Sequence, residues 1–251
     1  MRTSFIQDRI ARFRRSTTAL RPYSTDRVTL AQSHFGGVPN MAGLPGYPEC
    51  PHCTRPMGSV LQVYRRDVPE AYFPEDADLF HVFRCTNDAC EGDYAHYDLA
   101  TLAMFSRVGD AVRELPAPAG AQASKVCALS PKVMEDMPNF DDYPDDEPAI
   151  AVKFGDDLEE FFIDEHSALS ATKFGGWPSF TQSPFYPACT CGKVKEFFFQ
   201  LSSEDQLQVE GRPEVDDWSP HGIMMGDVGN IYFYVCRSCG PKTIESYFDC
   251  H

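Results

Sequence analysis

The sequence predicts an α+β fold whose mostly antiparallel sheets form two pseudo-equivalent lobes, each held by a structural four-cysteine zinc site. Three observations support this prediction. The chain contains an internal repeat, its short β-rich segments follow one another without regular intervening helices, and each half carries four closely spaced cysteines. Sequential short strands argue against a doubly wound parallel sheet. We therefore expect an internal duplication, with one repeat at residues 28–115 and the other at residues 168–251.

The repeat keeps a constant spacing in the two halves. Each half contains a Phe-Gly-Gly-x-Pro motif, at residues 35–39 and at residues 174–178. The last glycine of each motif lies 13 residues before the first cysteine of a pair, and the second cysteine lies 9 residues before a glutamine. The paired glycines suit tight loops before a proline, which is a backbone requirement rather than chemistry. The matching intervals are 37–50 and 176–189, followed by 53–62 and 191–200.

Residues 1–27 are expected to form a basic amphipathic helix. Thr3 or Ser4 can cap its start, and apolar residues at positions 5, 6, 10 and 13 form one stripe. Seven arginines against two aspartates give this segment a local charge of +5. Two interpretations stay open: a terminal helix that packs on the body, or a basic arm for an acidic surface or for organelle targeting.

The rest of the chain divides into strands and one acidic linker. Residues 116–167 form the expected linker, because proline-rich stretches lie at 116–120 and 137–148. Between positions 135 and 165, thirteen Asp and Glu residues stand against Lys153, a local charge of −12, and a surface helix is expected at 156–166. Aromatic and β-branched residues predict the strands. These predicted strands are 59–65, 79–84, 93–98, 149–154, 194–201, 231–235 and 243–248.

Each half carries two close cysteine pairs, which is the arrangement of a tetrahedral zinc site. Each pair can present two thiolates, and two pairs complete the shell of one Zn(II) ion. Four thiolates leave no position open for a substrate, so both sites are expected to be structural rather than catalytic. The expected ligands are Cys50, Cys53, Cys85 and Cys90 in the first half and Cys189, Cys191, Cys236 and Cys239 in the second.

Other uses of the cysteines stay open: a metal site in one half only, disulfides, or free thiols. Disulfides are disfavoured because the N-terminus shows no signal peptide and cysteine makes up only 10 of 251 residues. Cys127 and Cys250 fall outside the repeat and are expected to be ordinary thiols. His52 lies inside a cysteine pair but has no counterpart in the other half.

The composition predicts a cytoplasmic globular protein without a membrane span. The chain is 43% hydrophobic, and no apolar run approaches the roughly 20 residues that cross a bilayer. Its net charge of −15 repels the phosphate backbone of nucleic acids and attracts basic polypeptides. Nucleic-acid binding through zinc ribbons is therefore the least favoured function.

The two Phe-Gly-Gly-x-Pro motifs, the cysteine pairs and the segments around them resemble the programmed cell death protein 2 family. Residues 226–233 also resemble a related bacterial family of uncharacterised function that shares the fold but usually lacks the cysteines. The chain resembles a minimal, bacterial-type member without the MYND-type zinc finger, because Cys127 is the only cysteine in residues 99–170 of the sequence. The motifs are Ser-His-Phe-Gly-Gly-x-Pro at 33–39, Cys-x2-Cys at 50–53, Leu-Phe-His-Val-Phe-x-Cys at 79–85, Lys-Phe-Gly-Gly-Trp-Pro at 173–178 and Tyr-x-Cys at 234–236.

The resemblance implies a function in protein assembly. Eukaryotic members of the family act as dedicated chaperones, which capture a newly made small-subunit ribosomal protein and escort it toward assembly. For this chain the resemblance implies a basic protein client, and the acidic segment with its interleaved aromatic residues is the candidate surface. A solvated acidic linker is the competing interpretation. The candidate partner-binding residues are Asp141, Asp142, Asp145, Asp146, Phe161 and Phe162.

An enzymatic or small-molecule-binding function is the main alternative. The chain shows no glycine-rich phosphate loop and no H-E-x-x-H or G-x-S-x-G motif, so we expect no catalysis. The best candidate pocket is the glycine-rich loop at 218–229, with Trp218, His221 and Asp227. A turn that enters the next strand, with Asp227 capping backbone amides, is the competing interpretation.

Overall fold

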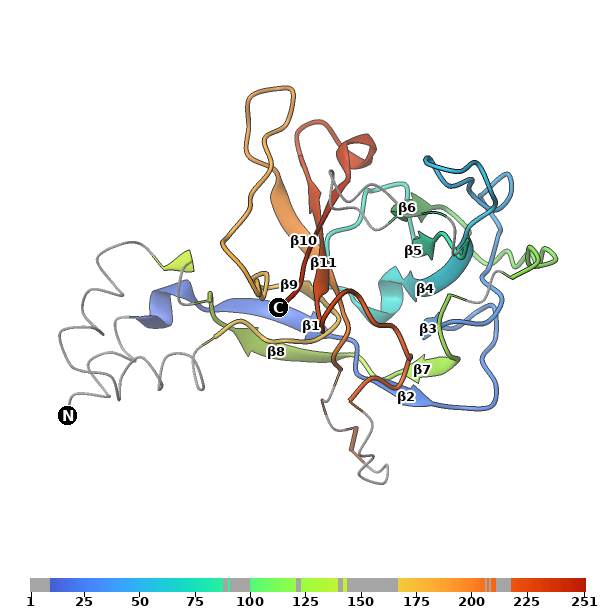
Figure 1. Ribbon diagram of the computed structural model, residues 1–251, viewed down its shortest axis with the longest axis horizontal. Helices are drawn as coiled ribbons and strands as arrows, with labels where there is room; N and C mark the ends of the chain where they lie inside the picture. The colour runs from blue at the N-terminus through green and yellow to red at the C-terminus, as the bar shows by residue number, and fades with distance from the viewer. Residues whose placement is uncertain are drawn as a thin grey trace.

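The computed structural model contains two six-stranded antiparallel sheets that pack against each other (Figure 1). We call them sheet A, with the strand order β12-β11-β10-β9-β1-β8, and sheet B, with the order β2-β7-β3-β4-β5-β6. The expectation of mostly antiparallel sheets is therefore confirmed. The structure describes residues 10–87, 90, 100–120, 123–139, 142–143, 167–205, 207, 209–210 and 218–251.

The strands are short, and few of the described residues are helical. No helix in these described ranges is long and apolar enough to cross a membrane. Sheet A consists of β1 (Arg15–Ala19), β8 (Lys132–Asp136), β9 (Lys173–Gly175), β10 (Glu196–Ser202), β11 (Asn230–Val235) and β12 (Glu245–Asp249). Sheet B consists of β2 (Pro22–Ser24), β3 (His34–Phe35), β4 (Gly58–Tyr64), β5 (Leu79–Arg84), β6 (Thr101–Ser106) and β7 (Cys127–Leu129). Short 3₁₀ turns include η1 (Ala11–Phe13), η2 (Arg65–Asp67) and η4 (Pro241–Thr243).

A two-stranded ribbon runs through both sheets and joins them. β1 pairs with β8 in sheet A, and β2, which follows β1 closely, pairs with β7 in sheet B. At the bend, the backbone N–H of Ser130 donates to the Leu20 carbonyl at 3.0 Å, and the Arg21 side chain donates to the Ser130 carbonyl at 2.8 Å. Figure 1 shows the ribbon passing from β1 and β8 to β2 and β7. The ribbon therefore ties the two sheets into one unit.

The first strand of this ribbon corrects the prediction of a helix over residues 1–27. Ile10 is helical and η1 follows it, but the chain becomes extended at Arg15 and stays so through most of β1 and β2. Thr17 and Thr18 are β-branched and buried, which favours a strand in this position. The helical spacing of apolar residues therefore ends at Phe13. Residues 1–9 lie outside the described residues.

The expected linker at 116–167 also contains strands, β7 and β8. Its charged residues suggest a solvated segment, but Asp136 is buried and Glu135 forms an ion pair with Arg14 at 3.4 Å. The linker interpretation is therefore wrong for residues 127–136. The strands predicted at 93–98 and 149–154 and the helix predicted at 156–166 lie outside the described residues, and the sequence pattern does not predict β6.

The two sheets share the register of their central strands. In sheet B, Phe35 of β3 pairs with Leu61 of β4, and in sheet A, Phe174 of β9 pairs with Phe199 of β10. A β-bulge occurs immediately before the second residue of each pair, in the ladder that β4 forms with β5 and in the ladder that β10 forms with β11. The two copies of the sequence repeat therefore have the same strand register and the same bulge position in their sheets.

Buried polar groups also occupy matching places. The side-chain carbonyl of Gln62 accepts the backbone N–H of Asn40 at 2.7 Å, and that of Gln200 accepts the backbone N–H of Ser179 at 2.9 Å. Both glutamines are fully buried, so these hydrogen bonds satisfy groups that water cannot reach. Two hydroxyl–carboxylate pairs correspond in the same way, Ser33 with Asp67 at 2.5 Å and Thr172 with Asp205 at 2.6 Å.

The main core lies between the sheets and consists largely of aromatic rings. Phe80 of sheet B contacts Phe174, Phe198 and Phe199 of sheet A, with ring centroids 5.0 to 5.8 Å apart. Such tilted and edge-to-face contacts add to the free energy of apolar burial. Side chains alternate along a strand, so Phe83 of β5 points to the opposite face, where it belongs to a second cluster with Cys50. This alternation places the first cysteine cluster on the outer face of sheet B.

Acidification is expected to destabilise the protein through two buried histidines of sheet B. His34 and His81 flank Gln62 in the ladder, and both are fully buried. Burial lowers the pKa of His34 to about 4 and the pKa of His81 to about 3, from 6.5. Below about pH 6.5 the unfolded chain takes up protons that the folded chain does not, so the free energy of unfolding falls as the pH falls toward 4. Each histidine is expected to contribute a loss of about 2 kcal/mol between pH 7 and pH 5.

Urea unfolding at the two pH values measures this loss. The variant His81→Leu has no ring to titrate, so its loss between pH 7 and pH 5 should be about 2 kcal/mol smaller than that of the wild type. His251→Gln, at the exposed C-terminus, is the matched control and should follow the wild type. Equal losses in wild type and His81→Leu would contradict the assignment.

Candidate metal centres

The first cysteine cluster is built where the loop before β4 meets the end of β5. The Cys50–Cys53 loop is closed by an isolated bridge between Glu49 and Pro56. Within it, the Cys50 backbone N–H donates to the Arg55 carbonyl at 2.8 Å, and Thr54 adopts a left-handed φ of +58°. This tight turn points both thiols toward the cysteines that follow β5.

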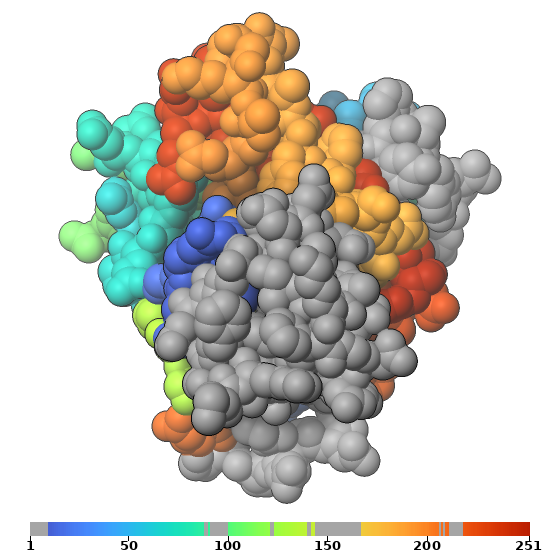
Figure 2. Space-filling view, turned by 90° about the vertical axis from the view of Figure 1, so that its left-hand side faces the viewer, coloured from blue at the N-terminus to red at the C-terminus, as the bar shows by residue number. Residues whose placement is uncertain are grey.

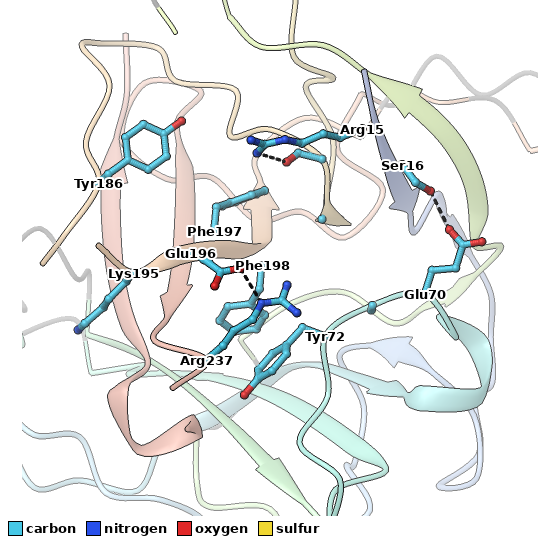
Figure 3. Close-up of a pocket in the computed structure, with 13 residues that line it drawn as sticks. Arg15, Ser16, Glu70, Tyr72, Tyr186, Lys195, Glu196, Phe197, Phe198 and Arg237 are labelled. Carbon is cyan, nitrogen blue, oxygen red and sulfur yellow. Dashed lines mark hydrogen bonds and ion pairs between the residues drawn. The ribbon is translucent and has the colours of Figure 1, made fainter. Parts of the chain in front are cut away.

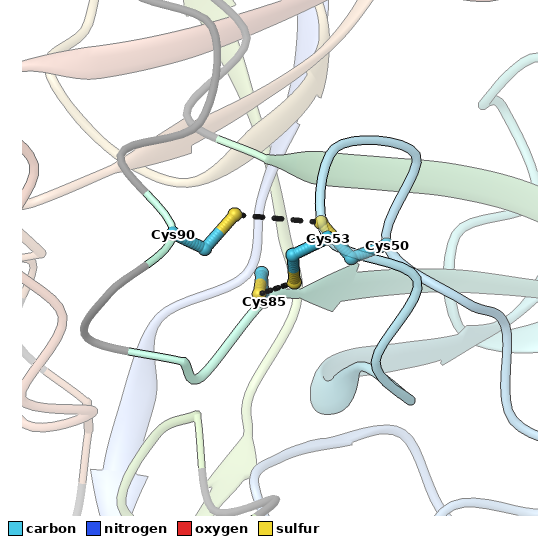
Figure 4. A group of neighbouring side chains, drawn as sticks. All are labelled: Cys50, Cys53, Cys85 and Cys90. Carbon is cyan, nitrogen blue, oxygen red and sulfur yellow. Dashed lines mark hydrogen bonds between the residues drawn. The ribbon is translucent and has the colours of Figure 1, made fainter.

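The four sulfurs of this cluster form a compact group (Figure 4). Cys50 Sγ lies 3.8 Å from Cys90 Sγ, Cys53 Sγ lies 3.5 Å from Cys85 Sγ, and all four lie within 4.8 Å of one another. A tetrahedral ion with metal–sulfur bonds of about 2.3 Å separates its sulfurs by about 3.8 Å. A disulfide would need an S–S distance of about 2.05 Å, and none of the ten cysteines forms one. The cluster therefore has the spacing of a metal site.

The second cluster repeats this construction with a shorter turn. Its loop is closed by a bridge between Ala188 and Val194, and the Cys189 backbone N–H donates to the Lys193 carbonyl at 2.7 Å. Gly192 adopts a φ of +86° at the place that corresponds to Thr54. Glycine adopts this conformation without strain, which suits the loop with one residue fewer between its cysteines.

The sulfurs of the second cluster lie as close together as those of the first. Cys191 Sγ is 3.7 Å from Cys236 Sγ, and the four ligand atoms lie within 4.8 Å of one another. Cys191 and Cys239 are exposed, so this cluster lies nearer the surface than the first. The predicted ligand sets are Cys50, Cys53, Cys85 and Cys90, and Cys189, Cys191, Cys236 and Cys239; the structure brings each set together.

Local hydrogen bonds lower the pKa of one thiol in each cluster, which favours the thiolate that binds a metal. The backbone N–H of Arg55 lowers the pKa of Cys53 to about 6, and the backbone N–H of Cys191 lowers the pKa of Cys189 to about 6. Conversely, burial raises the pKa of Cys85 to about 12, and the neighbouring thiols raise the pKa of Cys239 to about 12. Each cluster thus retains protons that a bound cation would displace.

The donor chemistry of both clusters fits a soft, tetrahedral metal ion. Four sulfur donors suit zinc or iron–sulfur chemistry, whereas magnesium and calcium prefer oxygen. A complete four-thiolate shell leaves no position for a substrate. Both clusters could therefore hold a metal ion in a structural role.

The predicted small-molecule loop at 218–229 does not gather its three candidate residues around a reacting centre. His221 is fully buried; its Nε2 donates to Asp205 at 3.0 Å and its Nδ1 accepts the Ile223 backbone N–H at 3.1 Å. Its ring also stacks on Phe35 of the first half at 4.6 Å. Trp218 and Asp227 are exposed. The geometry of His221 is that of a structural group between the two halves.

The predicted partner-binding residues fall mostly outside the described part of the chain. Asp142 is described, and its carboxylate accepts the Tyr186 hydroxyl at 3.0 Å. The other five candidates, Asp141, Asp145, Asp146, Phe161 and Phe162, lie outside the described residues.

Two packed antiparallel sheets with a four-cysteine cluster beside each define a β-rich class of protein with two candidate metal centres. Residues 33–238 match the family described as "Domain of unknown function (DUF1963)", and the chain belongs to this family. It is also 34% identical over 120 residues to programmed cell death protein 2 of Bos taurus. That match covers 39% of this chain and 33% of the bovine protein, so the chain spans about a third of that relative. The relationship indicated by the motifs is confirmed.

Proposed function

We propose that this chain is a two-zinc protein-interaction module that binds a basic polypeptide client, acts in the cytoplasm and catalyses no reaction. The cysteine clusters carry the metal-binding part of the proposal. Zinc is the structural ion best suited to isolated four-thiolate sites, and each bound ion would fix a loop to the end of a central strand. The matching registers, bulges and buried glutamines support our inference that the two halves arose by duplication.

The charge distribution supports a basic client. Thirteen acidic residues lie between positions 135 and 165. Among its described residues, Glu135 and Asp136 form ion pairs with Arg14 and Lys173, and Asp142 accepts the Tyr186 hydroxyl. An anionic segment attracts a cationic chain within about a Debye length. A newly made ribosomal protein, the client that the family resemblance suggests, is strongly basic.

The cysteine loops give less support to nucleic-acid binding. Arg55 and Arg237 lie close to the clusters, but Arg55 contacts Asn87 at 3.2 Å and Arg237 forms an ion pair with Glu196 at 2.7 Å. Phosphate recognition needs a basic stripe rather than a few engaged arginines. A protein client is therefore the better proposal.

Neutralising the acidic segment is expected to weaken client binding about tenfold or more. The variant replaces Asp141, Asp142, Asp145 and Asp146 with asparagine, which removes four charges but keeps an acceptor at Asp142 for Tyr186. The measurement is affinity capture from the native host, with elution in steps of rising salt and identification of the eluted proteins by mass spectrometry. The wild type should capture a roughly stoichiometric basic protein. The variant should release that protein at a lower salt concentration.

A matched control removes the same charge elsewhere. Glu75→Gln, Asp76→Asn, Asp110→Asn and Asp227→Asn alter four exposed residues of the described body. This variant should release the client at the same salt concentration as the wild type. If the client elutes from both variants at the same salt concentration, the acidic segment is a solvated linker. If the wild type captures no basic protein, the client proposal fails.

A further inference from the structure

A pocket of about 460 Å³ opens in sheet A at the junction of the two halves (Figure 3). Its size falls in the range of ligand sites, about 300–1,000 Å³. Arg15 and Ser16 of β1 line one side and Glu196 and Phe197 of β10 line another, with Tyr72 of the first half also in the lining. We call this pocket the slot. In Figure 2, the blue N-terminal strand reaches the surface between a turquoise segment of the first half and the orange segment of the second.

The slot exists because β9 is shorter than its two neighbours. β9 lies between β1 and β10 and ends at Gly175, where two successive glycines with φ of +70° and +72° turn the chain away. β1 and β10 both run antiparallel to β9, so they are parallel to each other and extend past its end. Two strand spacings separate them, about 10 Å, which is the width that one further strand occupies.

The strand edges that face the slot have no ladder partner in the described part of the chain. Arg15 and Ser16 pair with β8 on their other edge, and Glu196 and Phe197 pair with β11 on theirs. The pairing of β9 with β1 begins at Thr17, and its pairing with β10 reaches only to Phe199. Unpaired strand edges are templates for the backbone of another chain.

Sheet B closes the corresponding place with its own chain. There β7 takes the position that β1 has in sheet A, and the Ser124 hydroxyl donates to the Val60 carbonyl of β4 at 2.9 Å. A Cβ atom on Gly36 would lie 2.7 Å from the carbonyl oxygens of both Ser124 and Lys125.

Sheet A leaves this place open. A Cβ atom on Gly175, the counterpart of Gly36, would have only the Ser16 carbonyl oxygen within 4 Å, at 3.3 Å. Arg15 stands where the first half has Ser124, and its guanidinium lies over the Trp177 ring. The replacement of a small hydroxyl residue by arginine thus accompanies the open slot.

The charged groups of the slot indicate what kind of chain it takes. Lys195 and Arg237 form ion pairs with Glu245 and Glu196. The Arg15 guanidinium lies 3.3 Å from the Trp177 ring centroid and forms no ion pair within 4 Å among the described residues; the carboxylates of Asp142, Asp136 and Glu196 act on it from a longer range. Glu70 accepts only the Ser16 hydroxyl among those residues, at 2.7 Å. An occupant with one acidic and one basic side chain would complement both groups.

We propose that the slot binds an extended peptide segment of a partner protein by strand addition, antiparallel to β1 and β10, with an acidic side chain facing Arg15 and a basic side chain facing Glu70. The slot adjoins the acidic segment, because Tyr186 of the slot lining donates to Asp142, but strand addition at the slot goes beyond the proposed function. The backbone of the peptide would supply affinity through hydrogen bonds to both strand edges, and the two charged side chains would supply specificity.

A random 12-residue peptide library displayed on phage, selected against the full zinc-loaded chain, tests the proposal. Enriched peptides should carry both an acidic and a basic residue and should bind at micromolar Kd. Arg15→Gln and Glu70→Gln should each raise the Kd of a synthesised consensus peptide about tenfold. Arg14→Gln is the matched control, because Arg14 forms its ion pair with Glu135 and is not part of the slot lining, and it should leave the Kd unchanged.

Hydrogen exchange of the bound chain distinguishes strand addition from other occupants. The consensus peptide should slow exchange in residues 15–16 and 196–198, and methylating alternate backbone nitrogens of the peptide should abolish binding. The proposal is overturned by a library without enrichment, by peptides that bind Arg15→Gln as well as wild type, or by free phosphate or citrate competing fully without slowing that exchange. These outcomes are independent of whether a basic client binds the acidic segment.

Discussion

Replacing Cys53 with serine is expected to remove one zinc equivalent from the protein and to lower its melting temperature by more than 10 °C. Cys53 and Cys85 lie 32 residues apart in sequence, and a shared ion would fix the loop before β4 to the end of β5. Zinc binding to structural sites contributes about 10–16 kcal/mol in small zinc-binding peptides, as much as the whole stability of a domain, about 5–15 kcal/mol. A loss of about 5 kcal/mol corresponds to a fall in melting temperature of about 10–20 °C in a chain of this size, at about 2–4 °C per kcal/mol.

Metal content by mass spectrometry and thermal unfolding by circular dichroism check this expectation. Cys250→Ser is the matched control, since Cys250 lies outside both clusters, and it should retain two zinc ions and nearly the wild-type melting temperature. A Cys53→Ser protein with two zinc ions and an unchanged melting temperature would show that the first cluster is not a structural metal site.

The clusters could be predicted from the sequence because metal ligation imposes a local pattern. Two cysteines with one to four residues between them can point at one ion, and the repeat shows which distant pairs belong together. Whether Cys189 and Cys191, with one residue between them, can both reach one ion could not be predicted in this way. It depends on the backbone at Gly192, whose φ of +86° lets the chain turn one residue earlier.

The ribbon that joins the sheets could not be predicted, because its partners are distant in sequence. Arg15 pairs with Asp136, more than a hundred residues later, and neither segment has an alternation strong enough to reveal a strand. The slot escaped prediction for the same reason, since it depends on where β9 ends relative to β1 and β10. Local propensity predicts strands such as β5, whereas pairing across the sheet is a property of the whole chain.

The buried ion pair between Lys173 and Asp136 is another non-local contact, and breaking it is expected to be severely destabilising. Lys173 Nζ lies 2.8 Å from Asp136 Oδ2, and both side chains are 0% exposed. Burial lowers the pKa of Lys173, and the Asp136 carboxylate opposes that change. The carboxylate also accepts the backbone N–H groups of Leu169 and Trp177, each at 2.8 Å.

Asp136→Leu therefore removes the partner of a buried cation and two hydrogen-bond acceptors at once. Breaking a buried ion pair costs about 3–5 kcal/mol, and orphaned buried N–H groups add about 1–3 kcal/mol each. We expect Asp136→Leu to lose at least about 5 kcal/mol in urea unfolding. Asp136→Asn should lose less, about 3 kcal/mol, because its amide oxygen still accepts a backbone N–H and Lys173 can release its proton.

The neighbouring Glu135→Leu supplies the matched control for this comparison. Glu135 is 73% exposed and pairs with Arg14 at the surface, where an ion pair contributes less than about 1 kcal/mol. The two adjacent carboxylates thus lie on opposite sides of β8, one exposed and one buried. If Asp136→Leu unfolds within about 1 kcal/mol of Glu135→Leu, the buried pair does not hold β8 to the turn after β9. A large difference would show that the buried Lys173–Asp136 pair holds β8 to β9 and to the turn after it.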